Sequence, residues 1–496
     1  MNAMTRLPAA ILLLASSVAA AQADIAPTDP VLDAYLAEAL NTNPALQARD
    51  AASDASAAAA DAARAQRLPS MELRARYTRA EGGRTIDFPA GDLLNGVYST
   101  LNSFLQERGE APMFPQIENQ SIALLREREQ DTRLALTAPL YAPALWAQAD
   151  ALSAQHGAVS AAREAFARAL VREVKRAYYG AVQADASERI LASAVGLLEE
   201  DVRVSQSLVD AGKATRDRVL RAQAERLAIV QRQDQAALAA AQARRQLNAL
   251  RDVPADTPVA LADPKALALP QSGAFAAPRP ELRQLDQAIA AADAARRAAA
   301  AGQQPTIALA ADYGVQGVDY NVGREDDFSS VSLVLNWTLW DFGARAGKRR
   351  QAEAETDRLR AERRDLEHKL AIAQWSATES LQLALRSIDA ASARVAAAEE
   401  VFRIAERKRA AASLSQVEFI DAQRSQTEAR LNLAIARCEA LDRAAELELA
   451  NASFPLNAAQ RSAPPATANT IAARSTPRLA SKLTSSLSNS PATRPE

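Results

Sequence analysis

The sequence predicts a mainly α-helical protein with a β-barrel part, built from two tandem repeats of one pattern. Two segments of helix-forming residues, 143–210 and 344–411, have no internal proline and are far longer than ordinary globular helices. Four shorter segments alternate apolar and polar residues with the period of a β-strand. Each repeat is therefore expected to run helix, strand, loop, strand, long helix, tight break and short helix.

The composition argues against several classes of protein. The 496 residues carry 58 Lys and Arg against 60 Asp and Glu, and this balance disfavours a nucleic-acid-binding protein. The single cysteine, Cys438, excludes an internal disulfide, and His156 and His368 lie far apart in the sequence. Neither a phosphate-binding glycine loop nor a G-x-S-x-G motif is present. We therefore predict no enzyme, no cofactor, no catalytic residue and no metal site.

Residues 1–23 have the pattern of a signal peptide. Arg6 precedes an apolar stretch, and Ala21-Gln22-Ala23 fits the small residues of a cleavage site. The mature chain is expected to begin at Asp24, and no cysteine follows that could carry a lipid anchor. After this segment we expect no transmembrane helix, because no apolar run reaches about 18 residues.

Matching motifs place the two repeats in register. Asn43-Pro44-Ala45-Leu46-Gln47 matches Arg279-Pro280-Glu281-Leu282-Arg283 at an offset of 236, whereas Leu140-Tyr141 matches Leu339-Trp340 at 199. The first repeat therefore holds about 37 extra residues between its two strands. The predicted organisation is a first repeat at 24–251, a proline-rich linker at 252–278, a second repeat at 279–452 and a disordered tail at 453–496.

The predicted helices form a coiled-coil-like array. Apolar residues such as Ile190, Ala194 and Leu197 recur at steps of three and four residues. Two breaks, at about 210–218 and 411–418, have the chemistry of hairpin tips, with Gly212 and Thr215 in the first and the capping-box residues Ser415 and Glu418 in the second. The shorter helices are predicted at about 31–66, 215–250, 279–302 and 416–451.

Each predicted strand is long enough to cross a bilayer, for which about 9–11 tilted residues suffice. Four aromatic residues near the strand ends are candidates for a membrane interface. A soluble antiparallel sheet packed on helices is the alternative. The strands are predicted at about 69–79, 131–140, 305–316 and 328–340, and the aromatic residues are Tyr141, Trp337, Trp340 and Phe342.

Four strands cannot close a barrel alone, and an open edge in lipid would leave backbone amides without partners. Several chains must then share one barrel. An eight-stranded barrel is filled by its own side chains, so a pore requires at least three copies.

Several motifs occur in a fixed order and are duplicated: Leu40-Asn41-Thr42-Asn43-Pro44-Ala45-Leu46, Pro280-Glu281-Leu282, Leu339-Trp340-Asp341-Phe342-Gly343 and the two tips. With these motifs the chain resembles the TolC family of outer-membrane efflux and secretion channel proteins. The resemblance covers about residues 31–452 and implies a homotrimer. Its twelve strands, four per chain, would form one barrel in outer-membrane lipid, and its helices a barrel in the periplasm.

The resemblance also implies a role and partners. The chain would be the exit duct of a tripartite efflux pump or of type I secretion, joined to a periplasmic adaptor and an inner-membrane transporter. The resemblance does not decide whether the inner-membrane transporter is of the ABC or the proton-driven type. It does not identify the cargo either. By alternation, the insertion at about 81–128 would be an extracellular loop that either constricts the exit or has no transport role.

The family closes its periplasmic end near acidic residues after the second tip, and the matching residues are Glu418 and Asp421. Arg218 and Arg221 of the first repeat are candidates to pair with them and latch the closed state. A plain capping role for Glu418 is the alternative. The tips are also candidates for the adaptor contact, through Gly212, Lys213, Thr215, Ser413 and Ser415.

A structural coiled-coil envelope protein without a pore is the alternative from another class. Ion conductance in planar bilayers would separate the two hypotheses. Genes next to this one would distinguish small-molecule efflux from polypeptide secretion.

Overall fold

The computed structural model describes residues 29–269, 278–318, 326–411, 413–457 and 460. The predicted signal peptide and nearly all of the predicted tail lie outside these residues. The chain divides into two compact units, each with its own set of contacts. Unit 1 comprises Met1–Ala52, Ser160–Arg283 and Arg364–Glu496, and unit 2 comprises Ser53–Val159 and Gln284–Arg363.

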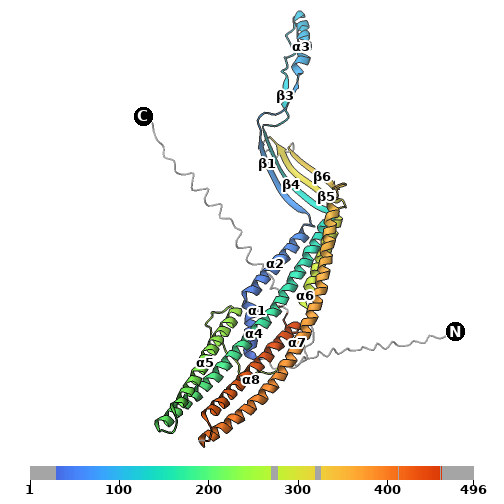
Figure 1. Cartoon of the computed structure of the whole chain (residues 1–496). Coiled ribbons are helices and arrows are strands. Elements are labelled where there is room, and N and C mark those ends of the chain that lie inside the picture. Colours follow the sequence, from blue (N-terminus) through green and yellow to red (C-terminus); the bar gives the residue numbers. More distant parts are fainter. Residues whose placement is uncertain (1–28, 270–277, 319–325, 412, 458–459, 461–496) are drawn as a thin grey trace, which may run out of the picture. The chain divides into compact units, whose positions relative to one another are not determined.

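Two helices dominate the fold, α4 with 68 residues and α7 with 67. Each is followed by a tight turn and a 35-residue helix that runs back beside it, as Figure 1 shows. The helices of the two repeats are α1 (Pro30–Thr42), α2 (Pro44–Ala65), α4 (Pro143–Asp210), α5 (Arg216–Leu250), α6 (Pro280–Ala301), α7 (Ala344–Ala410) and α8 (Gln416–Ala450).

The helix predicted at 31–66 is two helices, α1 and α2, separated at Asn43. The Asn43 side chain accepts hydrogen bonds from the backbone N–H groups of Ala45 (3.0 Å) and Leu46 (3.1 Å), and so caps α2. Pro44 follows as the first residue of α2, where its missing N–H costs nothing. The same side chain donates to the carbonyl of Leu250 at 2.9 Å, which fixes the break against the end of α5.

The core of unit 1 lies where α1, α4, α5 and α8 meet, around the fully buried Tyr178. Residues 253–269, part of the predicted linker, lie along this core. The backbone N–H of Ala260 donates to the Tyr35 hydroxyl at 2.8 Å, and Asn248 donates to the carbonyl of Thr257 at 2.8 Å. Residues 270–277 of the same predicted linker lie outside the described chain.

Unit 2 contains an antiparallel sheet in the order β1-β4-β5-β6, visible side by side in Figure 1. The two repeats each contribute one pair of neighbouring strands. Among the described residues, the outer edges of β1 and β6 pair with no further strand. The strands are β1 (Ser70–Arg79), β4 (Arg128–Tyr141), β5 (Thr306–Gly317) and β6 (Asp327–Asn336).

The register gives the sheet one apolar face and one polar face. Leu73 lies opposite Leu134, and Leu134 opposite Tyr313, so apolar side chains continue from strand to strand. The other face places Arg74 opposite Arg133 and Arg133 opposite Gly314. Gly314 makes room for this arginine, because an added Cβ would lie 2.6 Å from the Cβ of Arg133.

The insertion predicted as a loop at 81–128 has regular structure instead. It contains β2 (Thr85–Phe88), the 18-residue helix α3 (Ala90–Glu107) and β3 (Gln120–Ala123), with β2 paired to β3. Figure 1 shows this arm continuing beyond the ends of β1 and β4. Its glycines and prolines suggested irregular chain, but they lie mainly at the junctions between these elements.

The fourth strand ends earlier than predicted, at Asn336 rather than residue 340. Its partner β5 begins at Thr306, which lies opposite Asn336, so no strand remains to pair with residues 337–340. The alternating pattern continues through Trp337 and Leu339, but alternation alone does not supply a hydrogen-bonding neighbour.

Candidate functional site at the helical hairpin ends

The two hairpin ends are exposed turns of different chemistry. In the turn between α4 and α5, Gly212 has φ of +70°, a conformation that favours glycine, and the N–H of Lys213 donates to the carbonyl of Leu208 at 2.8 Å. Thr215 is the N-cap of α5. In the turn before α8, the N–H of Ser413 donates to the carbonyl of Lys408 at 2.9 Å. The five candidate adaptor-contact residues are all exposed.

Glu418 forms the capping box that its spacing from Ser415 predicts. Its carboxylate accepts hydrogen bonds from the Ser415 hydroxyl at 2.8 Å and from the Ser415 N–H at 3.0 Å, and its own N–H donates to the Ser415 hydroxyl at 3.2 Å. These bonds, led by that from the hydroxyl, lower the pKa of the Glu418 carboxyl. Glu418 is thus a negative charge held at the start of α8.

The other three gate candidates have separate partners within the chain. Asp421 lies 3.9 Å from Arg424, Arg221 lies 3.8 Å from Asp217, and Arg218 donates to the Ser205 hydroxyl at 3.4 Å. Over the described residues, neither arginine forms an ion pair with Glu418 or Asp421 in the same chain. A pairing between copies of the chain stays a prediction.

The link that joins the two hairpins in this chain involves Asp201, a residue that the sequence reasoning missed. Its buried carboxylate accepts hydrogen bonds from Arg409 at the end of α7 and from Gln416 at the start of α8, the latter at 2.5 Å. The guanidinium of Arg409 also lies 3.9 Å from the centroid of the Phe419 ring. The sequence contained a signal for this residue, because Asp201 lies at helical spacing from Ala194 and Leu198 and so falls on the same buried stripe of α4.

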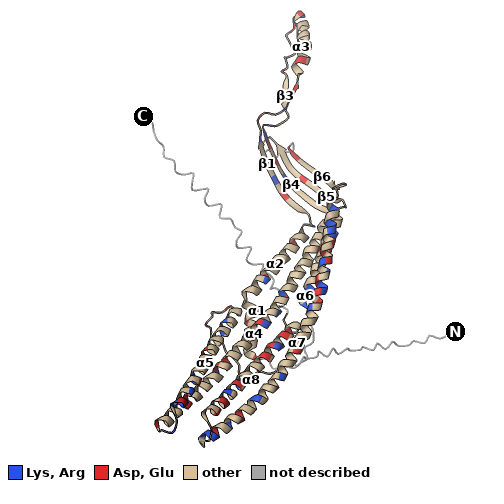
Figure 2. Cartoon of the chain, viewed as in Figure 1, with Lys and Arg blue, Asp and Glu red and all other residues tan. Residues whose placement is uncertain are grey.

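A second, more exposed ion pair joins the hairpins further from the turns. Arg424 of α8 forms a two-pronged pair with Glu225 of α5, with N–O distances of 2.7 and 3.2 Å. Further from the turns than these pairs, Leu198 of α4, Ile229 of α5 and Leu431 of α8 belong to one buried cluster. The hairpin ends therefore combine a packed apolar centre with charged links, and Figure 2 shows many charged residues along these helices.

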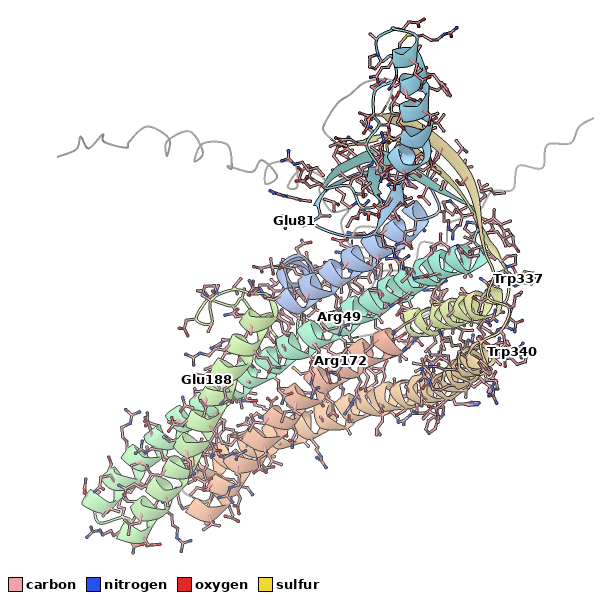
Figure 3. The ribbon with its side chains drawn as sticks, turned by 90° about the horizontal axis from the view of Figure 1, so that it is seen from above. Arg49, Glu81, Arg172, Glu188, Trp337 and Trp340 are labelled. Carbon is pink, nitrogen blue, oxygen red and sulfur yellow. The ribbon has the colours of Figure 1, made fainter. Side chains whose placement is uncertain are left out.

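The four aromatic candidates gather at the end of the sheet that adjoins the helices. Tyr141 donates from its hydroxyl to the Gln304 amide oxygen at 2.6 Å, and the Trp337 indole N–H donates to the Gln303 carbonyl at 3.1 Å. Trp340 and Phe342 are 75% and 93% exposed, and their rings meet edge to face with centroids 5.9 Å apart. Figure 3 labels Trp337 and Trp340 along the segment between β6 and α7. Polar tips anchored at the sheet end and apolar rings left exposed are typical of membrane-interface aromatics.

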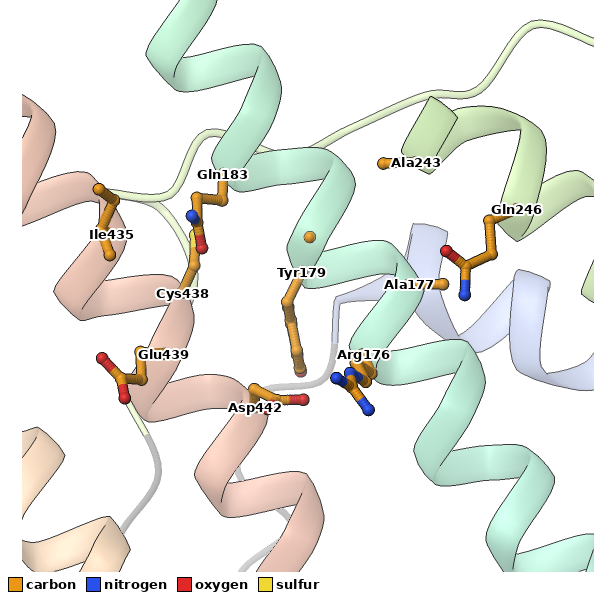
Figure 4. A pocket seen from close by; sticks show the side chains of 11 residues that line it. Arg176, Ala177, Tyr179, Gln183, Ala243, Gln246, Ile435, Cys438, Glu439 and Asp442 are labelled. Carbon is orange, nitrogen blue, oxygen red and sulfur yellow. The ribbon is translucent and has the colours of Figure 1, made fainter. Parts of the chain in front are cut away.

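A pocket of about 380 Å³ lies between α4, α5 and α8 in unit 1, shown in Figure 4. Its lining includes Arg176, Tyr179, Cys438 and Asp442. Burial raises the pKa of the Cys438 thiol to about 12 and also raises the pKa of the Tyr179 hydroxyl, so both groups stay protonated at neutral pH. The pocket thus offers no activated nucleophile.

Two features are absent from the described residues. No group of histidine, cysteine and acidic residues there could hold a metal ion. No helix in the same part of the chain combines the length and the apolar character needed to cross a membrane.

Solved structures with this arrangement of helices and strands are outer-membrane channels. The outer-membrane channel OprN is 18% identical, with a TM-score of 0.69 over 86% of this chain and 90% of that one. The Campylobacter jejuni CmeC channel is 14% identical, with a TM-score of 0.71 over 86% of each chain. The open state of the Neisseria gonorrhoeae MtrE channel is 18% identical, with a TM-score of 0.68 over 88% of this chain and 91% of that one.

These similarities define the class: the chain has the fold of one protomer of an outer-membrane channel, and the predicted fold class is confirmed. The sequence model of the outer membrane efflux protein family matches residues 274–453, which include the whole second repeat as predicted up to residue 452. No curated protein sequence matches the chain.

Proposed function

We propose that three copies of this chain form an outer-membrane exit duct, which passes substrates from an inner-membrane transporter and a periplasmic adaptor to the exterior. Outer-membrane efflux is the role that names the family matched by residues 274–453. The proposed duct has its strands in the outer membrane and its helices in the periplasm.

The observation that carries this proposal is the four-stranded sheet with two different faces and two unpaired edges. Its apolar face suits lipid, and its face with Arg74, Asp131 and Arg133 suits a water-filled lumen. In lipid, the edges of β1 and β6 need partners, which other copies of the chain can supply. Three copies provide twelve strands, enough for an open pore.

The hairpin ends are proposed to form the periplasmic entrance. Three copies would bring Glu418 and Asp421 together as six carboxylates, which attract cations. The exposed turns with Lys213 and Ser413 are the proposed adaptor contact. The Asp201 link would hold α7 and α8 against α4 while the entrance is closed.

The test is the assembly and conductance of the mature protein. Protein extracted from outer membranes with detergent is expected to migrate as a heat-resistant trimer and to form ion-conducting channels in planar bilayers. Trimers without conductance would favour the structural coiled-coil protein. A monomer that stays in solution without detergent would contradict the channel altogether.

A further inference from the structure

The helix α3 uses its polar face for contacts inside its own arm. Asn95 exchanges two hydrogen bonds with the backbone of Ile117, both at 2.8 Å. Asn102 donates to the carbonyl of Phe114 at 2.7 Å, and the rings of Tyr98 and Phe114 lie 5.4 Å apart between centroids. The returning segment therefore covers this face of α3.

The opposite face of α3 is apolar and exposed. Leu93, Val97 and Phe104 are 64%, 55% and 57% exposed, and their spacing of four and seven residues places them on one stripe. Leu94 and Leu101 flank the stripe and are also exposed. A contiguous apolar surface of this kind marks an interaction site, because isolated proteins rarely leave one in water.

We propose that the α3 stripe packs against the same stripe on the other two copies, so that three helices form a cap over the exit of the duct. This inference rests on the proposed trimer. The arm is a direct continuation of the sheet, since the N–H of Ala80 donates to the Glu127 carbonyl and the N–H of Leu124 to the Arg84 carbonyl, both at 2.9 Å. The arm therefore extends from β1, the edge strand that the proposed barrel shares with a neighbouring copy.

The charges of the arm favour other copies of the chain, rather than lipid, as the partner of the α3 stripe. Residues 81–123 carry six acidic residues and two basic ones, a difference of four negative charges. Such an arm is repelled by the anionic headgroups of an outer-membrane surface. On α3 the only charged residues are Asp92 and Glu107, near its two ends, so three stripes can meet without burying a charge.

Disulfide cross-linking of Val97→Cys tests the contact in the intact protein. The only native cysteine, Cys438, is buried, so it does not interfere. With a copper–phenanthroline oxidant, Val97→Cys is expected to yield covalent dimers within the trimer on denaturing gels. The matched control is Ser99→Cys, an exposed residue of the same helix about 160° around its axis, which is expected to stay monomeric on those gels.

Equal cross-linking of the two variants, or none in either, would overturn the cap if heat-resistant trimers are present. Absence of trimers in the unmodified protein would instead contradict the proposed function. A spin label at position 97 tests whether lipid, rather than other copies of the chain, covers the α3 stripe. Faster collision with dissolved oxygen than with a water-soluble nickel complex would place the stripe in lipid and reject the cap.

Conductance tests whether the cap narrows the exit. Val97→Glu places three carboxylates at the contact and is expected to raise single-channel conductance at least twofold, whereas Ser99→Glu leaves it unchanged. Unchanged conductance in Val97→Glu would contradict a constricting cap.

Discussion

Asp201 of α4 is almost completely buried, and its carboxylate binds the Arg409 guanidinium at the far end of α7. The contact joins residues 208 positions apart, and Gln416 supports it from the next helix. One acidic side chain thus ties the α7–α8 hairpin to α4 close to both turns. In the proposed channel, this link would limit how far α7 and α8 move away from α4.

Removing that charge should loosen the hairpin ends. Asp201→Asn leaves the partly buried Arg409 without its counter-ion, at a cost of roughly 2–3 kcal/mol. In planar bilayers we expect a higher conductance and more frequent open states than in the unmodified channel. The control is Asp210→Asn, an exposed residue of the same helix that accepts a hydrogen bond from Gln206. Equal conductance in both variants would remove Asp201 from the closed state.

The carboxylates after the second tip should control the response to cations. The double variant Glu418→Ala with Asp421→Ala removes six charges from the proposed trimer and is expected to weaken block by divalent cations at least tenfold. Asp256→Ala, an exposed carboxylate outside the tips, is the control. Block titrated with cobalt ions measures the effect. A double variant that keeps the original block would assign Glu418 to helix capping alone.

Low pH should weaken the packing around Glu164 of α4, a residue that forms ion pairs with Arg168 and Arg283. Burial would raise its pKa, but hydrogen bonds from Arg283 and Arg168 outweigh burial, so the pKa lies below the ordinary 4.5. This stabilisation is present above about pH 4.5 and is lost as the pH falls through the lowered pKa. Glu164→Gln should therefore cost roughly 2 kcal/mol at pH 7 and progressively less in acid.

Thermal unfolding is followed by the helical circular dichroism signal between pH 3 and pH 7. The unfolding midpoints of Glu164→Gln and of the unmodified protein are then compared at each pH. Glu173→Gln, which alters a half-exposed carboxylate on the same helix, is the control. A Glu164→Gln deficit that does not shrink at low pH would refute the assignment.

Gly314 of β5 should tolerate no side chain. An added Cβ would lie 2.5 Å from the carbonyl oxygen of Thr132 and 2.6 Å from the Cβ of Arg133. Gly314→Ala is therefore expected to cost about 3 kcal/mol and to reduce the yield of heat-resistant trimers. Gly180→Ala, with nothing within 4 Å of its added Cβ, should leave the yield unchanged. Normal yields for Gly314→Ala would mean that β4 and β5 separate locally.

Helix ends were predictable where local chemistry sets them. Pro143 and Pro280 begin α4 and α6, and the Ser415–Glu418 capping box begins α8, because these residues act within one turn of their own helix. The break at Asn43 escaped prediction, although Asn43 caps α2 and Pro44 begins it, because helix-forming residues on both sides hid this local signal. The contact of Asn43 with Leu250, which is 207 residues away, could not be read from the sequence.

The candidate site was only partly predictable for the same reason. The sequence motif around Glu418 is local, and the structure shows the bonds that it implies. Asp201 and Arg409 carry no shared motif, and only folding brings them together. Likewise, the alternation of apolar and polar residues continues to Trp340, but β6 stops at Asn336 because β5 provides no further partner.

The sequence by itself determined the two repeats, the long helices and the strands with one apolar face, because periodicity and capping depend on neighbouring residues. Tertiary structure alone decided that Asp201 links the two hairpins and that the 81–128 insertion carries a helix with an exposed apolar stripe. Both depend on contacts between residues distant in sequence, whose geometry no local pattern encodes.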